Sequence, residues 1–365
     1  MSSLPDLRAI ANAFNLHGEF LSAAPYGSGH INDTYRAEFN QGGTRVNYIL
    51  QRINHTVFKN LPALMENVQR VTAHLAGKVA AESDCSRRGL TLIATREGGW
   101  WHQDGLGNFW RVYIFIEGAR TYDTAESETQ AYEAARAFGR FQHWLADLPA
   151  PRLHETIPDF HNTPARVKAL EQAVTADVVN RALQSKAEIE FVLQRKSWTN
   201  RVAKASLPER VTHNDTKLNN VMLDDATGTG ICVIDLDTVM PGLVLYDFGD
   251  MVRTVTTPAK EDERDLSKVV MRFPMFAALA RGYLESAGGF LTAGERQHLA
   301  FSGKLITLEI GIRFLTDFLA GDTYFKVHRE GHNLDRSRAQ FRLVESIEQQ
   351  EEQMCRYIEE LNIAS

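Results

Sequence analysis

The sequence lacks the features that typify secreted, membrane-spanning and zinc-binding proteins. Only three of its 365 residues are cysteines, and the wide separation of Cys85, Cys232 and Cys355 indicates neither a disulfide framework nor a zinc site. No stretch approaches the roughly 20 consecutive apolar residues that a membrane helix needs. The segment "MSSLPDLRAIANAF" has no apolar core of signal-peptide length. We therefore expect a cytoplasmic protein without a membrane partner.

Positive charge is not in excess. The 40 lysines and arginines are outnumbered by 46 aspartates and glutamates, which gives a formal net charge of −6. Because binding to nucleic-acid phosphates requires a net basic face, we expect no nucleic-acid partner. A local basic pocket for a phosphorylated small molecule remains compatible with this charge. With 44% hydrophobic and 24% charged residues, the composition is that of a globular protein of one large or two medium domains.

The pattern of apolar residues changes after Gly118. Residues 1–118 are rich in strand patterns, with a short helix predicted over 4–16 and a longer one over 61–80. Residues 119–365 are dominated by helical spacing, and Asp123 with Glu126 three residues later predicts the start of the first helix there. We therefore predict an α+β protein with an N-terminal lobe over 1–118 and a helical C-terminal lobe over 119–365. The helical patterns lie at 123–148, 164–195, 262–320 and 339–362.

One segment places many carboxylates beside apolar runs. "VTHNDTKLNNVMLDDATGTGICVIDLDTV", residues 211–239, contains short stretches that indicate buried strands, and a buried carboxylate is costly unless a cation relieves it. His213, Asp215 and Asn220 follow the order H-x-D-x-x-x-x-N that a phosphotransferase catalytic loop requires. We predict that Asp215 accepts the proton of an acceptor hydroxyl and that the amide oxygen of Asn220 binds Mg²⁺.

Other residues of this segment complete the predicted chemistry. Asp235 follows a strand twenty residues after Asp215, where a second oxygen ligand for Mg²⁺ is expected. Lys217 is placed to neutralise charge on the transferred phosphoryl group, so we count it as catalytic with Asp215. We expect His213 to support the loop by hydrogen bonding. Asp237 either orients the loop or approaches a second metal ion.

A second acidic motif lies downstream. Asp247, Phe248 and Gly249 imitate the magnesium-binding motif of protein kinases, but they come 32 residues after Asp215 and beyond a proline-glycine turn. We therefore assign the metal to Asp235. For Asp247 we predict a structural role, such as capping the next helix.

The segments "THNDTKLNNVMLD" and "VIDLDTVMPGLVLYDFGD" resemble the aminoglycoside phosphotransferase and choline kinase-like family. That family usually shows "HGDLHPGN" followed by "IDW", whereas this chain has Asn214, Lys217 and Leu236 in place of the glycine, histidine and tryptophan. These departures, with "GHINDTY", "YILQRIN" and "RFLTDFLAGDTYF", resemble the bacterial N-acetylhexosamine 1-kinases over nearly the whole chain. The resemblance implies a protein-kinase-like two-lobe fold with a small antiparallel-sheet N-lobe and a larger helical C-lobe. It also implies Mg²⁺ and ATP as the phosphoryl donor.

The expected nucleotide site begins with a glycine turn. Gly27, Ser28 and Gly29 lie between two strand patterns and would let backbone N–H groups approach phosphate oxygens. The sequence has no G-x-x-x-x-G-K-[ST], so a P-loop fold is not indicated. "YIFIEG" resembles the hinge of the family, which implies that adenine binds beside Phe115 to Glu117.

A kinase-like fold also requires a cation on its third strand, held by a glutamate from a helix. "YILQRIN" offers Gln51 or Arg52 at this place. We favour Arg52 because its guanidinium is always charged and can grip phosphate with two N–H groups. Glu66 on the following helix is the nearest candidate partner, although a solvated helix glutamate is an equal alternative.

The acceptor site is predicted around the segment "LEIGIRFLTDFLAGDTYFKVH". The helical segments show no aromatic cage for a fixed cation. Arg313 and Asp317 are four residues apart and share a helix face, so a simple ion pair is one interpretation. The resemblance favours the other, in which Arg313 and Tyr324 bind a neutral sugar and its acetamido group. Three residues near the glycine turn are further candidates for sugar contacts: His30, Asn32 and Asp33.

The predicted reaction is ATP-dependent phosphorylation of the anomeric hydroxyl of an N-acetylhexosamine, such as N-acetylglucosamine or N-acetylgalactosamine, to the sugar 1-phosphate. The alternative acceptors are choline, homoserine and aminoglycosides. A nucleotide-binding module without transferase activity is disfavoured because Asp215, Asn220 and Asp235 are all present. The expected partners are the sugar and ATP, and we expect a monomer or weak dimer.

Overall fold

The computed structural model describes residues 5–27 and 31–364. The chain divides into two compact units. The first comprises Met1–Ala119, Asp147–Ile157 and Ile231–Met240, and the second comprises Arg120–Ala146, Pro158–Gly230 and Pro241–Ser365. The first unit therefore takes in two later segments that the sequence analysis assigned to the C-terminal lobe. One of these segments carries Asp235 and Asp237.

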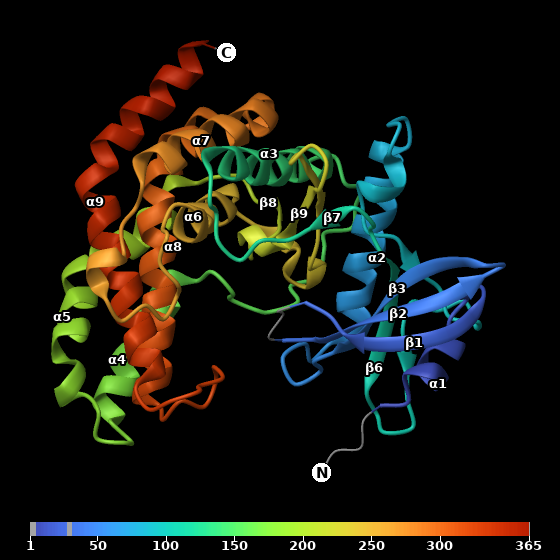
Figure 1. The fold of residues 1–365 in the computed structure, drawn as a ribbon. Helices are drawn as coiled ribbons and strands as arrows, with labels where there is room; N and C mark the ends of the chain where they lie inside the picture. The colour runs from blue at the N-terminus through green and yellow to red at the C-terminus, as the bar shows by residue number, and fades with distance from the viewer. Residues whose placement is uncertain (1–4, 28–30, 365) are drawn as a thin grey trace. The chain divides into compact units, whose positions relative to one another are not determined.

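The first unit is built on an antiparallel sheet in the order β1-β2-β3-β6-β4, with β5 paired to β6. Figure 1 labels β1, β2, β3 and β6 of this sheet. The β2–β3 hairpin turns on Gly42 and Gly43, which both have positive φ, as a two-residue hairpin favours. The register places Thr34 opposite Gln51 and Gln51 opposite Arg111. The strands are β1 (Glu19–Pro25), β2 (Asp33–Gln41), β3 (Thr44–Ile53), β4 (Leu92–Ile93), β5 (His102–Gln103) and β6 (Phe109–Ile114).

Alternation along β6 separates two environments. Trp110 and Val112 join an apolar cluster with residues of helix α1 (Leu7–Asn12) on one face of the sheet. Because successive side chains of a strand point to opposite faces, Arg111, which lies between them, faces the other side. Its Nη1 contacts the sulfur of Met65 in helix α2 (Leu61–Val79) at 3.9 Å. Asn60 caps α2 by accepting a hydrogen bond from Ala63 N. This arrangement places an arginine in the core between the sheet and α2.

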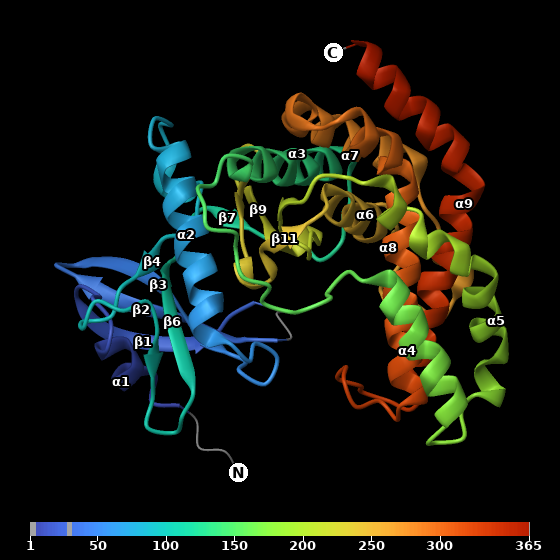
Figure 2. The same ribbon diagram turned by 180° about the vertical axis from the view of Figure 1, so that it is seen from behind.

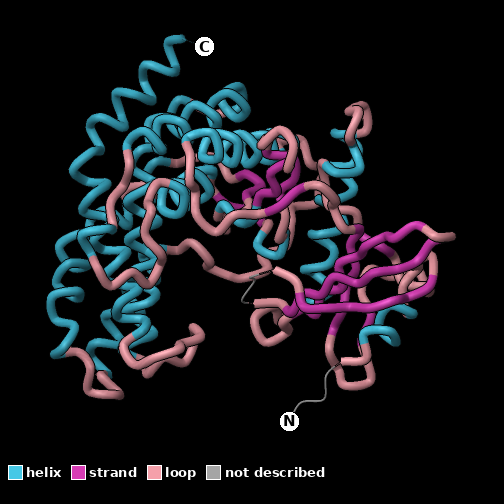
Figure 3. The backbone as a smooth tube through the Cα atoms, in the orientation of Figure 1, coloured by secondary structure: helices cyan, strands magenta, loops and turns pink. Residues whose placement is uncertain are grey.

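The second unit is mainly helical (Figure 3). Helices α3 and α7 lie side by side, as do α8 and α9, in both ribbon views (Figures 1 and 2). The helices are α3 (Glu128–Leu145), α4 (Thr163–Ala176), α5 (Lys186–Arg195), α6 (Val244–Val255), α7 (Phe273–Ala287), α8 (Ala293–Leu319) and α9 (His332–Ala364). Outside the large sheet, the short strands are β7 (Ala119–Arg120), β8 (Arg210–Thr212), β9 (Val221–Asp224), β10 (Gly230–Val233) and β11 (Met240–Gly242), and most of β10 belongs to the first unit.

Glycine permits the close approach of α6 and α8. A Cβ atom on Gly249 would lie 2.5 Å from the backbone oxygen of Ser302 and 2.8 Å from Ile306 Cγ1. Gly303, one residue after Ser302, has the same constraint against Val252, at 2.7 Å. The glycine of the motif Asp247-Phe248-Gly249 is therefore explained by helix packing.

The predicted start of the first helix after Gly118 needs correction. Helix α3 begins at Glu128 with Ser127 as its N-cap, whose side chain accepts from Gln130 N, and not at Asp123. Asp123 instead accepts a hydrogen bond from Asn219 Nδ2 at 3.2 Å.

Of the helices in the part of the chain that the structure describes, none has both the length and the apolar character needed to cross a membrane.

Candidate active site

The predicted catalytic loop follows β8 and is anchored by Asp247. The two carboxylate oxygens of Asp247 accept hydrogen bonds from His213 N at 2.9 Å and Asn214 N at 2.7 Å. Thr216 Oγ1 donates to the Asp247 backbone oxygen at 2.7 Å. Asn214 has φ 65°, a conformation that asparagine tolerates better than most residues. These contacts fix the backbone on both sides of Asp215.

Asp247 thus has a structural position, but it does not cap α6. The N-cap of α6 is Leu243, without a side-chain cap, and Asp247 lies inside the helix. Burial raises the pKa of the Asp247 carboxyl, while the hydrogen bonds from His213, Asn214 and Gln142 oppose this rise. His213 is also buried, and its Nδ1 accepts from Asp215 N at 3.3 Å, which is the supporting contact expected of it.

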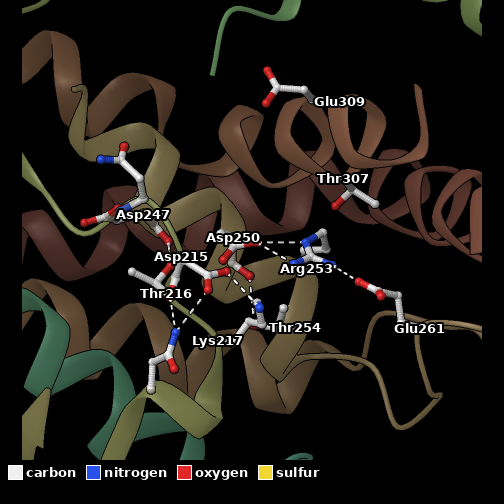
Figure 4. Close-up of polar contacts among 12 residues, drawn as sticks. Asp215, Thr216, Lys217, Asp247, Asp250, Arg253, Thr254, Glu261, Thr307 and Glu309 are labelled. Carbon is white, nitrogen blue, oxygen red and sulfur yellow. Dashed lines mark hydrogen bonds and ion pairs between the residues drawn. The ribbon is translucent and has the colours of Figure 1, made fainter. Parts of the chain in front are cut away.

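Asp215 and Lys217 lie together (Figure 4), and Asn220 also contacts Asp215. Lys217 Nζ is 3.0 Å from Asp215 Oδ1, while Asn220 Nδ2 donates to the Asp215 backbone oxygen at 2.8 Å and to its Oδ2 at 3.2 Å. Burial alone would raise the pKa of the Asp215 carboxyl, but the charges of Lys217 and His213 hold it below its usual value. Asp215 is therefore a carboxylate at neutral pH, held by a cation and an amide.

An acidic and basic cluster that the sequence analysis missed lies beside Lys217. Arg253 of α6 is buried and contacts Asp250 Oδ1 through Nε at 2.8 Å and Glu261 through Nη1 at 3.2 Å (Figure 4). The pKa of Lys217 is raised chiefly by Asp215 and further by Glu261 and Asp250. The available signal was the i,i+3 spacing of Asp250 and Arg253 in "YDFGDMVR".

The two predicted metal ligands have suitable chemistry. The amide nitrogen of Asn220 is turned toward Asp215, which leaves its amide oxygen for a hard cation. Asp235 follows β10 in a left-handed conformation, with φ 59° and ψ 63°, at the start of the 3₁₀ turn Leu236–Thr238. Non-glycine residues in this conformation concentrate at functional sites. An amide oxygen and a carboxylate oxygen are each a kind of ligand that Mg²⁺ prefers, and the assignment of these two residues stays a prediction.

The cation expected on β3 is not held as predicted. Arg52 Nε contacts Asp33 Oδ2 at 2.8 Å across the β2–β3 pair, with 37% and 50% of the two side chains exposed. Glu66 contacts His154 Nε2 at 2.8 Å and Arg70 at 4.0 Å. The expected pair of Arg52 with Glu66 is therefore not formed.

Among the described residues of this unit, the buried cation is Arg111, which was not predicted from the sequence. Its side chain is 1% exposed and contacts Asp237 Oδ1 through Nη1 at 2.5 Å, while Gln51 Oε1 accepts from its Nε at 3.0 Å and Nη2 at 2.6 Å. Burial favours loss of the charge, but Asp237 and, more weakly, Asp235 raise the pKa of Arg111 above its usual value. The signal in the sequence was an arginine inside the apolar run "FWRVYIFI".

Two predicted residues near the glycine turn, Asn32 and Asp33, make polar contacts within the first unit. Gly27 has φ 82° and open space around it, so its conformation and not crowding favours glycine. Asn32 Nδ2 donates to Asp237 Oδ2 at 2.7 Å, and Asn32 Oδ1 accepts from Asn54 N at 2.9 Å. Asp33, a candidate for sugar contact, is paired with Arg52. The other members of this predicted set, Ser28, Gly29 and His30, lie outside the described residues.

The segment predicted to contact adenine follows β6. Phe115 N donates to Asn47 O at 3.2 Å, and the ring of Phe115 contacts Tyr26 edge-on with centroids 5.4 Å apart. Glu117 Oε1 accepts from Asn47 Nδ2 at 2.7 Å, and its backbone oxygen accepts from Arg87 Nε at 2.8 Å. Two of the backbone groups in this segment are therefore already occupied.

The guanidinium of Arg313 lies among aromatic rings. It is 5.2 Å from the ring centroid of Phe160, 5.6 Å from Phe325 and 6.0 Å from Tyr324. Asp317 accepts from the backbone amides of residues 323, 324 and 325 at 2.8–2.9 Å, so it orders the loop after α8. The simple ion pair of Arg313 with Asp317 is not formed among the described residues. Tyr324 is 62% exposed.

A buried histidine joins α8 to the catalytic loop. His161 Nδ1 lies 2.8 Å from Glu309 Oε1, and its Nε2 lies 3.1 Å from Asn214 O. Thr163 Oγ1 donates to the other oxygen of Glu309 at 2.5 Å. Because both partners of the imidazole are acceptors, the contacts favour the protonated ring. Burial lowers the pKa of His161, but Glu309 outweighs this and raises it.

These features define a class of protein. The antiparallel N-terminal sheet, the helical C-terminal part and the order of the catalytic segment are those of a protein-kinase-like fold. Residues 22–291 match the family described as "Phosphotransferase enzyme family". The chain belongs to this family, and it is a phosphotransferase.

Solved structures agree with this fold. A spectinomycin phosphotransferase in complex with ADP and spectinomycin has a TM-score of 0.62 at 11% identity, covering 96% of this chain and 100% of that one. An aminoglycoside phosphotransferase from Alicyclobacillus acidocaldarius has a TM-score of 0.61 at 12% identity, covering 97% and 98%. A microcompartment-associated aminopropanol kinase has a TM-score of 0.56 at 14% identity, covering 96% and 98%. The predicted resemblance to the aminoglycoside phosphotransferase and choline kinase-like family and the predicted fold class are confirmed.

Proposed function

We propose that this phosphotransferase moves the terminal phosphoryl group of ATP to the anomeric hydroxyl of an N-acetylhexosamine, giving the sugar 1-phosphate and ADP. The observation that carries the proposal is the set of contacts around Asp215. Its carboxylate is ionised, lies 3.0 Å from Lys217 Nζ, and is fixed by backbone contacts of the flanking residues to Asp247. A carboxylate held in this way can orient a hydroxyl group and receive its proton.

The residues of this chain have separate roles in the proposed reaction. Asp215 binds the acceptor hydroxyl and takes its proton as the O–P bond forms. Lys217 offsets the negative charge of the transferred group, because a fixed cation costs no reorganisation during the reaction. Asn220 and Asp235 would hold Mg²⁺, which neutralises charge on the nucleotide phosphates when it is bound. ATP as donor is supported by the ADP in the complex of the spectinomycin phosphotransferase.

The surroundings of Arg313 favour a neutral acceptor. Three aromatic rings and no carboxylate within ion-pair distance surround this guanidinium among the described residues. A cationic acceptor would meet a like charge there, whereas the hydroxyl and acetamido oxygens of a sugar can accept hydrogen bonds from a guanidinium. Aromatic faces also pack against the apolar face of a sugar ring. Arg313 and Tyr324 therefore remain our candidates for sugar contact.

The test is acceptor-dependent ADP release with ATP and Mg²⁺. The panel contains N-acetylglucosamine, N-acetylgalactosamine, plain hexoses, choline, homoserine and kanamycin, and the product is checked for an acid-labile anomeric phosphate. Turnover confined to the acetamido sugars supports the proposal. Turnover on choline, homoserine or kanamycin would keep the role of Asp215 and remove the proposed acceptor. Nucleotide binding without any acceptor-dependent ADP release would instead indicate a binding module.

Two variants separate the catalytic role from general effects. Asp215→Asn removes the carboxylate that takes the proton and is expected to abolish turnover while nucleotide binding stays nearly intact. Asp225→Asn is the matched control, because Asp225 is an exposed acid that pairs only with Arg120 at 2.6 Å in the described residues. Retention of most of the rate by Asp215→Asn would exclude Asp215 as the base.

A further inference from the structure

In the sheet of the first unit, the buried cation Arg111 lies on β6 and not on the third strand, where it was expected. In protein kinases, activity requires a lysine on the third strand that is paired with a glutamate from the following helix. Here β3 supplies Gln51, whose side-chain oxygen accepts two hydrogen bonds from Arg111 on the neighbouring strand β6. The two residues are opposite each other in the β3–β6 register. The two arginines of β3, Arg45 and Arg52, are not buried, and the buried positive charge lies one strand away, on the same side of the sheet as Gln51.

The acid that neutralises this cation does not come from α2. Glu66 of α2 contacts His154 and Arg70, and α2 offers Arg111 only the sulfur of Met65. Arg111 instead pairs with Asp237, which is 2% exposed. An isolated buried charge is costly, so each member of this pair depends on the other for its burial.

Both oxygens of Asp237 are occupied within the first unit. Oδ1 accepts a hydrogen bond from Arg111 Nη1, and Oδ2 accepts one from Asn32 Nδ2 at 2.7 Å. The backbone oxygen of Asp237 accepts from Thr156 Oγ1 at 2.8 Å, and Val239 O accepts from Asn67 Nδ2 at 3.1 Å. The segment around Asp237 is thus fixed through its side chain and its backbone. Of the two roles considered for Asp237, these contacts support orientation of the loop by its carboxylate.

Asp235 lies two residues before Asp237, in a left-handed conformation that its neighbours must maintain. We propose that Arg111 is a positioning residue for the nucleotide site: through both its pairing with Asp237 and the Gln51 bridge to β3, it holds Asp235 in the orientation that binds Mg²⁺ with the nucleotide. This inference rests on the proposed function, since it takes Asp235 as a metal ligand. In this proposal Arg111 and Asp237 take the role of the paired lysine and glutamate of protein kinases in place of Arg52 and Glu66.

The experiment measures binding of a fluorescent ADP analogue as a function of Mg²⁺ concentration. Arg111→Lys keeps the charge but cannot bridge Gln51 and Asp237 with a planar fork. The double variant Arg111→Met/Asp237→Leu removes both charges and leaves no lone buried ion, so its fold is expected to survive. Arg52→Gln is the matched control, because it breaks the exposed pair with Asp33 on the same sheet. Circular dichroism and thermal unfolding check that each variant is folded.

We expect the variants to weaken binding of the ADP analogue only when Mg²⁺ is present. Loss of a residue that orients a metal ligand typically weakens metal affinity about 10- to 100-fold. The Mg²⁺ concentration for half-maximal binding should rise by about this factor in Arg111→Lys and in the double variant, and change less than about twofold in Arg52→Gln. Binding of the analogue without Mg²⁺ should be the same in all variants.

Two results would overturn the inference. An unchanged Mg²⁺ requirement in the folded double variant would show that the pair is structural only. An equal loss of binding with and without Mg²⁺ would assign Arg111 to direct phosphate contact and remove its positioning role. In contrast, a wild-type protein whose nucleotide binding does not respond to Mg²⁺ would contradict the proposed function itself, so the two failures are distinguishable.

Discussion

Lys217 Nζ lies 3.0 Å from Asp215 Oδ1, so the proposed proton acceptor and the residue proposed to offset phosphoryl charge are in direct contact. Lys217→Met is expected to lower kcat by about 100-fold, because it removes a fixed cation that acts as charge develops in the transition state. The KM for the acceptor should change little. Steady-state kinetics check this, with the exposed Lys260→Met as control. A rise in acceptor KM at unchanged kcat would assign Lys217 to acceptor binding.

Gly249 is expected to tolerate no side chain. Gly249→Ala would place its Cβ 2.5 Å from Ser302 O, and overpacking of this kind costs about 1–3 kcal/mol of unfolding free energy. Urea unfolding gives the measurement. Gly289→Ala, at a position with nothing within 4 Å of the new Cβ, is the control and should be near neutral. Equal stability of the two variants would contradict the packing explanation for the motif Asp247-Phe248-Gly249.

The pair of His161 and Glu309 should make stability depend on pH. The folded-state pKa of His161 is raised, chiefly because Glu309 outweighs the effect of burial, with a smaller contribution from Asp250. Its stabilising contribution is therefore complete below the unfolded pKa of about 6.5 and is lost as pH rises through the folded pKa. The unfolding free energy of the wild type should fall over this window.

The variant that tests this dependence is His161→Gln, which keeps a hydrogen-bonding side chain but cannot ionise. Its unfolding free energy should be lower than that of the wild type at pH 6 and should vary less between pH 6 and 9. The pKa of Glu309 is lowered, so this carboxyl is protonated only at more acidic pH. Its titration therefore does not affect the unfolding free energy between pH 6 and 9. Parallel profiles for the two proteins would remove His161 as the titrating group.

Arg313→Met should separate acceptor binding from donor binding. If Arg313 donates hydrogen bonds to the sugar, its loss is expected to raise the acceptor KM about tenfold or more, because a charged hydrogen bond contributes about 1.5–3 kcal/mol. The KM for ATP should stay unchanged. Arg338→Met is the control, since Arg338 of α9 pairs with Glu188 of α5, whereas Arg313 is on α8. An unchanged acceptor KM would move the acceptor site away from Arg313.

The catalytic segment was predictable because its residues are close in sequence. Asp215, Lys217 and Asn220 lie within six residues of one another. The proximity of their side chains could therefore be predicted without knowing the tertiary structure. Periodicity likewise predicted the helix over 61–80, which forms as α2. The family resemblance depended on the same local order of polar residues.

Contacts between distant segments were not predictable in this way. Arg111 and Asp237 are separated by 126 residues, and periodicity only marks Arg111 as an anomaly in an apolar strand. For the start of α3, Asp123 and Ser127 are both suitable caps, and the choice between them depends on tertiary contacts such as that of Asp123 with Asn219. In each case the sequence offers several partners and the packing selects one.

The left-handed backbone at Asn214 has a consequence for how this sequence can vary. Asparagine replaces the family's usual glycine here, and these are the two residues that adopt φ near 65° most readily. The side chain that asparagine adds accepts from Thr212 Oγ1 at 3.0 Å and would lie 2.9 Å from a Cβ on Gly242. Thr212 Oγ1 would lie even closer to that atom, at 2.3 Å. Positions 212, 214 and 242 therefore share one small volume, and related sequences that enlarge one of them should shrink another.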